Sequence, residues 1–88
     1  MPEELENAVQ EVLALFREGR IMRGEHRYDL ERHQWGFDQK KNDYYHRVET
    51  AAPDVPTRCE YGEKVVRFWL EHWLKLQGLD RLKKEQGW

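Results

Sequence analysis

Residues 57–77, TRCEYGEKVVRFWLEHWLKLQ, predict one long and unusually apolar helix, around which the other elements must pack. Thr57 with Glu60 three positions later forms a capping box, and Gly78 stands where a glycine commonly ends a helix. Acidic residues precede basic residues by four positions along one solvated stripe. The other positions carry Cys59, Val65, Val66, Phe68, Trp69, Leu70, Trp73, Leu74 and Leu76. This apolar stripe is wider than the roughly 100° that faces a single core, so more than one surface must cover the helix.

Residues 2–18 predict a second helix of ordinary amphipathic character. Pro2 and the glutamates that follow it suit a helix start, and Gly19 suits its end. The apolar residues recur every three or four positions, as Leu5, Ala8, Val9, Val12, Leu13 and Phe16. We expect this stripe to pack in the same core as residues 57–77.

Residues 20–50 alternate polar and apolar side chains with the period of β-strands. The alternation changes phase near residues 32–34, which predicts a bulge or a turn there. The polar segment QKKND then separates WGFD from YYHRVET, and Asn42 with Asp43 supplies turn chemistry. We predict a β-hairpin. A helix is the alternative, because heptad-like spacing links Leu30, Gln34, Phe37, Lys41, Tyr44 and Val48, although Asp, Asn and Gly residues disfavour it.

These elements predict a single small α+β domain of order α–β–β–α. Two helices would pack on one face of a β-hairpin or a three-stranded antiparallel sheet, with residues 51–56, AAPDVP, as a stiff linker. The alternative is an all-α bundle in which residues 25–50 are helical. In the tail of residues 78–88, we expect a further helical turn or two, with Leu79 and Leu82 folding back onto the core.

Composition excludes several classes of protein. The 88 residues carry a formal net charge of −2, which argues against a general nucleic-acid binder. Cys59 is the only cysteine, so no intramolecular disulfide forms, and we expect a semi-buried structural thiol. The first residues lack the features of a signal peptide, and no apolar run is long enough to cross a membrane. We therefore expect a cytoplasmic protein without membrane association.

Catalytic and metal chemistry have few candidate residues. The chain has one Cys, no Ser, two Thr and no glycine-rich phosphate loop. The four histidines lack the spacing of a metal motif, and even a close pair of His33 and His46 would supply only two ligands. We expect no enzymatic activity, no cofactor and no metal ion.

Basic and aromatic residues interleave in the predicted hairpin, as they do at protein-interface hot spots. The predicted partner-binding residues are Arg27, Arg32, Trp35, Phe37, Tyr44, Tyr45 and Arg47, together with Phe68, Leu74 and Trp88. The leading hypothesis is a non-catalytic protein-binding module that regulates or inhibits a larger protein. One alternative is a nucleic-acid-binding regulator that uses the same hairpin. The other is structural: the aromatic residues line the core and the basic residues face water.

The long helix also predicts self-association. At 1.5 Å per residue, residues 57–77 would run about 30 Å and residues 2–18 about 25 Å, which leaves part of the long helix uncovered near Phe68 and Leu74. A two-fold homodimer through residues 65–76 would cover it. In size and composition the chain resembles the compact accessory proteins of phages and mobile elements, and this resemblance implies a host protein as the partner.

Overall fold

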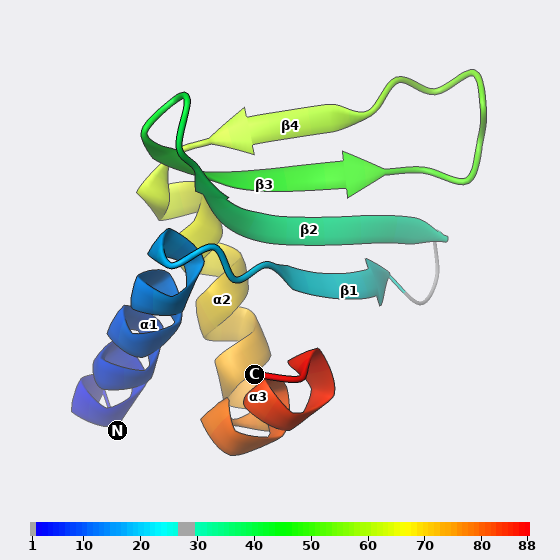
Figure 1. Ribbon diagram of the computed structural model, residues 1–88. Helices are drawn as coiled ribbons and strands as arrows, with labels where there is room; N and C mark the ends of the chain where they lie inside the picture. Colours follow the sequence, from blue (N-terminus) through cyan, green and yellow to red (C-terminus); the bar gives the residue numbers. More distant parts are fainter. Residues whose placement is uncertain (1, 27–29) are drawn as a thin grey trace.

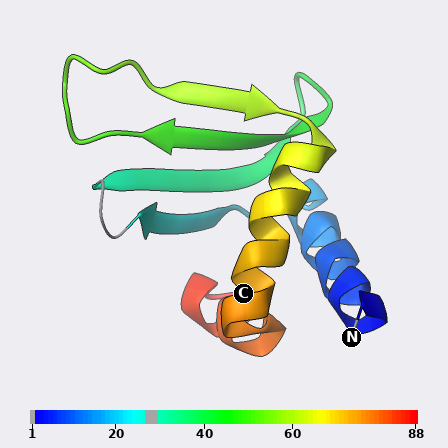
Figure 2. The ribbon, with the colours of Figure 1, turned by 180° about the vertical axis from the view of Figure 1, so that it is seen from behind.

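The computed structural model describes residues 2–26 and 30–88 (Figure 1). In chain order the elements are α1 (Pro2–Arg17), β1 (Met22–His26), β2 (Glu31–Asp38), β3 (Asp43–Glu49), β4 (Arg58–Tyr61), α2 (Glu63–Gln77) and α3 (Leu79–Gln86). The strands form a four-stranded antiparallel sheet in the order β1-β2-β3-β4. Figure 2 shows the helices gathered on one side of this sheet. The predicted α+β class is confirmed, the sheet has one or two more strands than predicted, and the all-α alternative is wrong.

The segment 57–62 forms a strand where the sequence pattern predicts the start of a helix. Its residues pair antiparallel with β3, and α2 begins only at Glu63. Gly62 precedes the helix with a φ of 134°, a conformation that favours glycine. The capping-box prediction for Thr57 and Glu60 is therefore wrong. The physical reason is that β3 offers this segment a ladder of backbone hydrogen bonds, which outweighs a local capping preference of about 1 kcal/mol.

β2 runs without the bulge predicted near residues 32–34, because its register against β1 and β3 is continuous. The chain reverses before β2 instead, where Leu30 has a φ of 52°. His33 consequently shares a face with Trp35. The predicted turn after β2 is confirmed: Asn42 has a φ of 54°, and the Asp38 carboxylate accepts hydrogen bonds from the next residues of the turn.

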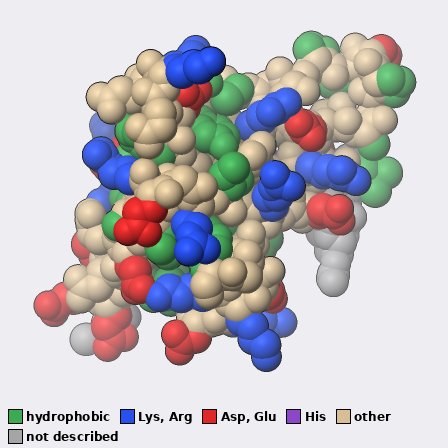
Figure 3. Space-filling view, viewed as in Figure 1, with side chains coloured by type: hydrophobic (Ala, Val, Ile, Leu, Met, Phe, Trp, Pro, Cys, Tyr) green, Lys and Arg blue, Asp and Glu red, His purple; other side chains and the backbone are tan. Residues whose placement is uncertain are grey.

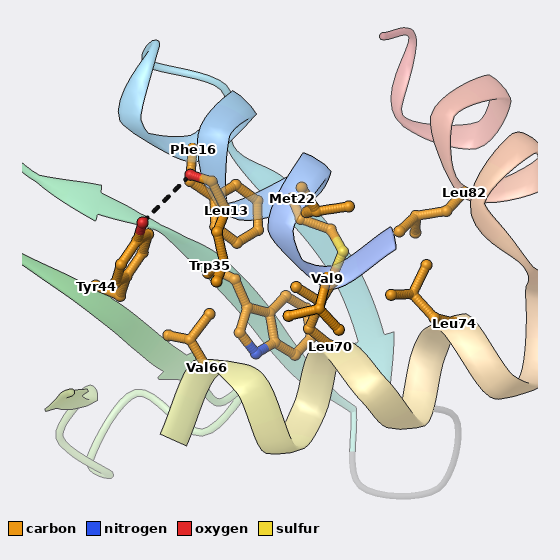
Figure 4. Close-up of a cluster of buried hydrophobic side chains, with 11 residues drawn as sticks. Val9, Leu13, Phe16, Met22, Trp35, Tyr44, Val66, Leu70, Leu74 and Leu82 are labelled. Carbon is orange, nitrogen blue, oxygen red and sulfur yellow. Dashed lines mark hydrogen bonds between the residues drawn. The ribbon is translucent and has the colours of Figure 1, made fainter. Parts of the chain in front are cut away.

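The core lies between the sheet and the two long helices (Figure 4). Trp35 of β2 is the largest fully buried side chain, and Phe16 of α1 is the next. The Tyr44 hydroxyl donates to the Leu13 carbonyl at 3.4 Å and accepts a hydrogen bond from Arg17 at 2.7 Å. These bonds satisfy a polar group at the core boundary and tie β3 to α1. The other buried apolar residues are Val9, Val12, Leu13, Met22, Val48, Val66, Leu70, Leu74 and Leu82.

The tail is folded back onto the core, as predicted. α3 follows Gly78 directly; its Leu82 is fully buried and Leu79 packs against the core. Trp88 is held by a backbone hydrogen bond to Lys83 and meets Phe16 edge to face, with ring centroids 6.0 Å apart. Trp88 is therefore partly a core residue and is not a free anchor for a partner.

Candidate functional site

Alternation along the strands divides the predicted binding residues between the two faces of the sheet. Trp35 and Tyr44 point toward the helices and are 1% and 4% exposed, and Phe37 packs against the same core. Leu74 of α2 is also buried, at 6%. The structure thus places in the core four residues that the sequence pattern assigns to a binding surface, because the helices cover this face of the sheet. Arg27 lies outside the described residues.

Arg32, Tyr45 and Arg47 lie together on the outer face of the sheet, turned away from the helices. The Arg32 side chain lies 3.9 Å from Glu25, and the Arg47 guanidinium lies 2.9 Å from Glu49. Figure 3 shows acidic and basic side chains interspersed over the molecule in this view. The outer face is therefore charge-paired, and of the predicted aromatic residues it keeps Tyr45, whose ring centroid lies 6.3 Å from that of Tyr61.

Cys59 lies on the same outer face, and its thiol is exposed. The prediction of a semi-buried thiol is wrong because the segment forms an edge strand instead of a covered helix. The neighbouring Tyr61 hydroxyl donates to the Asp38 carboxylate at 3.1 Å. Hydrogen bonding to Cys59, followed by burial and the Asp38 contact, raises the pKa of Tyr61 to about 12, so this phenol stays protonated.

The inner face carries a buried pair of histidines. His33 Nδ1 lies 2.9 Å from His46 Nε2, so one nitrogen donates and the other accepts. The two rings are nearly parallel, and the His46 ring stacks on Trp35 with centroids 5.0 Å apart. Burial, then the neighbouring His33, then Arg58 lower the pKa of His46 to about 4. His46 is therefore neutral near pH 7.

A continuous row of side chains on α2 remains only partly covered, and we call it the α2 flank: Val65, Phe68, Trp69, His72 and Leu76. Phe68 and Leu76 are 68% and 69% exposed. The Trp69 ring lies over the histidine pair, with centroids 5.7 Å from His33 and 5.3 Å from His46. The flank thus contacts the core through Trp69, and Phe68 and Leu76 extend into solvent.

Of the two causes of exposure that the sequence suggests, a longer helix and a wide apolar stripe, only the second holds. α1 and α2 have 16 and 15 residues, so the predicted difference in helix length is wrong. The other predicted cause holds: the apolar stripe of α2 is too wide for its neighbours. Val66, Leu70 and Leu74 fill the core, and the flank continues the stripe around the helix.

Sequence reasoning missed two features of this region. The first is the packing of the Trp73 indole against Gly24, at which a Cβ atom would lie 2.9 Å from the ring. The second is the histidine pair as a support for Trp69. The turn after Asp38 carries a signal for the second feature, because it fixes a register with His46 opposite Trp35 and thus beside His33.

Comparison of the chain with protein-family models, curated proteins and solved structures found no match. Within residues 2–26 and 30–88, no three His, Cys, Asp or Glu side chains are grouped to hold a metal ion. None of the helices in that part of the chain has the length and apolar character needed to span a membrane. The α2 flank and the outer face must therefore be interpreted from their own geometry.

Proposed function

We propose that this chain is a non-catalytic protein-binding module that inserts the α2 flank into an apolar groove of a larger protein and thereby regulates or inhibits it. The observation that supports the proposal is the exposure of Phe68 and Leu76 beside the half-buried Trp69. Val65, Phe68, Trp69, His72 and Leu76 follow the i, i+3, i+4, i+7, i+11 spacing of helices that dock in grooves.

The flank is supported by rigid neighbours. Phe68 meets Trp69 edge to face, with centroids 5.6 Å apart, and Trp69 rests on His33 and His46. A helix held in this way loses little conformational freedom when it binds. Aromatic anchors surrounded by polar residues are typical of the centre of protein interfaces, and Lys64 and Lys75 are exposed on the same helix.

The outer face gives less support to nucleic-acid binding. Arg32 and Arg47 of the outer face lie 3.9 and 2.9 Å from carboxylates of the same chain. Phosphate contacts would have to compete with these pairs. Of the aromatic rings, Trp35 and Tyr44 are in the core, and Tyr45 with Tyr61 stays on the outer face. Anisotropy titrations with single- and double-stranded oligonucleotides at low salt test this alternative, and we expect no binding at micromolar concentrations.

A matched pair of substitutions tests the proposed function. Phe68→Asp places a charge in the flank, and Val55→Asp places one at an exposed apolar residue of the loop between β3 and β4. The immobilised wild type and Val55→Asp chains are expected to retain one stoichiometric partner from a lysate of the source cells. Phe68→Asp is expected to weaken retention at least about tenfold, since interface anchors commonly contribute that much. Near-ultraviolet circular dichroism checks that all three chains fold.

Equal retention by Phe68→Asp and the wild type would contradict the proposal, as would the absence of a stoichiometric partner. A homodimer through residues 65–76 would use the same flank. Sedimentation equilibrium of the isolated chain separates the two cases: a dimer that Phe68→Asp dissociates assigns the flank to self-association. A monomer of 10.8 kDa leaves the flank free for the larger partner.

A further inference from the structure

The two edges of the sheet differ in how their backbone groups are satisfied. At β1, the Gln86 side chain accepts a hydrogen bond from the Arg23 N–H at 2.9 Å and donates one to the Arg23 carbonyl at 2.8 Å. A side-chain amide thus occupies the place that a neighbouring strand would take. At β4, residues 51–60 are exposed, and no element of the described chain lies beyond the strand (Figure 1, Figure 2). The open edge of the sheet is therefore β4.

The direction of the free backbone groups on β4 follows from its pairing. The Gly62 N–H donates to the Tyr44 carbonyl at 2.9 Å, which continues the ladder between β3 and β4. Hydrogen-bonded and non-hydrogen-bonded residues alternate in an antiparallel pair, so Arg58 and Glu60 also bond toward β3. Cys59 and Tyr61 are left to present their N–H and C=O groups to the open edge.

A second copy of the chain can pair with this edge across a two-fold axis, and the registers centred on Cys59 and on Glu60 keep the most residues of β4 paired. With Cys59 opposite Cys59 of the second copy, Arg58 faces Glu60 of the second copy. By symmetry, Glu60 faces Arg58 of the second copy, so the dimer has two such contacts. With Glu60 opposite Glu60 of the second copy, two like charges face each other. Directly opposed unlike charges stabilise antiparallel strands and like charges destabilise them. Charge therefore selects the register centred on Cys59.

We infer that β4 is a dimerisation edge, through which two copies of this chain form one continuous eight-stranded sheet in the register centred on Cys59. Addition stops at two chains, because a further strand at the β1 edge of either copy would have to displace Gln86 from the backbone groups of Arg23. The edge is separate from the α2 flank, so the dimer leaves the flank accessible. This inference stands independently of the proposed function.

Cys59 reports directly on this arrangement. In a hydrogen-bonded antiparallel pair, the opposed Cα atoms lie about 5.5 Å apart, which is within the range for a disulfide. The thiol is exposed on the outer face, and Cys59 is the only cysteine. Oxidation with a copper–phenanthroline catalyst and dioxygen should therefore join the two copies through this residue.

The test measures self-association by sedimentation velocity over a concentration series and, in parallel, the rate of oxidative cross-linking. The Glu60→Arg substitution replaces both contacts between residues 58 and 60 of the two copies with like-charge contacts. It should raise the dissociation constant of the dimer about tenfold or more. The double variant Arg58→Glu with Glu60→Arg restores the complementary pairs and should recover the wild-type association. Glu18→Arg, at an exposed residue outside the sheet, is the matched charge control and should associate like the wild type.

Further outcomes overturn the inference. A wild-type chain that stays monomeric at high micromolar concentration and cross-links no faster than Glu60→Arg has no β4 dimer. A dimer that Phe68→Asp dissociates and Glu60→Arg does not is a dimer of the α2 flank. The Glu60→Gln variant separates the two registers. In the inferred register this substitution removes the contact with Arg58 and must weaken the dimer. A stronger dimer would instead indicate the register centred on Glu60, where the substitution removes a like-charge contact.

Discussion

Acidification is expected to destabilise this fold between pH 6.5 and pH 4 through His46. Burial of the ring, the His33 nitrogen 2.9 Å away and the charge of Arg58 lower its pKa from 6.5 to about 4. Below pH 6.5 the unfolded chain therefore binds a proton that the folded chain does not. The free energy of unfolding falls as the pH falls through this window, and the effect is complete below pH 4.

The size of the effect follows from the two pKa values. At about 1.4 kcal/mol per pKa unit, the difference between 6.5 and 4 is worth about 3 kcal/mol. At 0.05–0.15 kcal/mol per residue, an 88-residue domain has a total stability of about 4–13 kcal/mol, so the loss is large. Other ionisable groups face the pair: Glu31 lies 3.5 Å from His33 Nε2, Glu60 of β4 lines a hollow with His46, and His72 lies on α2 above Trp69.

Urea denaturation followed by tryptophan fluorescence measures the effect in steps between pH 7 and pH 4. His46→Gln keeps a neutral hydrogen-bonding side chain and should flatten the pH dependence, although the variant is less stable at pH 7. Glu6→Gln is the control. Contacts with Arg67, then with Gln10, lower the pKa of Glu6 from 4.5 to about 2, so the contribution of Glu6 to stability changes with pH only below about 4.5. This variant should therefore keep the wild-type pH dependence between pH 7 and pH 4.5. A wild-type slope unchanged in His46→Gln would refute the assignment.

Three further predictions concern packing and charge. Trp88→Ala removes an aromatic ring packed on α1 and should cost about 1–3 kcal/mol, seen as a lower thermal midpoint by calorimetry; an unchanged midpoint would mean that the ring is not held. Gly24→Ala places a Cβ atom 2.9 Å from Trp73 and should cost about 1–3 kcal/mol in urea denaturation, and Trp73→Phe should relieve part of that cost. Arg67 binds both oxygens of Glu6 at 2.7 and 2.9 Å, so a double-mutant cycle should give a favourable coupling that shrinks in high salt, and a coupling independent of salt would contradict a charge contribution.

The elements that were predictable from sequence are those with local signals. α1 begins near Pro2 and ends before Gly19, and the turn before β3 lies where Asn42 adopts a positive φ. The division between α2 and α3 follows Gly78 in the same way. In each case, one residue with a strong conformational preference marks the boundary, and no distant contact is needed to find it.

The parts that could not be predicted depend on pairing between distant residues. A Thr and a Glu three positions apart suit a helix cap, and only the presence of β3 makes Thr57 precede a strand. The face occupied by Trp35 or Tyr45 depends on the register of each strand against its neighbours, which pairing between distant residues fixes. Composition alone cannot separate Tyr44 in the core from Tyr45 on the outer face, although the two residues are adjacent.

The hydrogen bonds between Gln86 and Arg23 also determine when the sheet becomes protected during protein synthesis. The two residues are 63 positions apart, so β1 is made long before the side chain that closes its edge. At about 5–20 residues per second, roughly 3 to 13 seconds separate the two on the ribosome. During that interval the nascent chain carries an unpaired strand edge at β1, and once β4 is made it carries a second. The β1 edge is therefore satisfied only after α3 has emerged, whereas the β4 edge stays open.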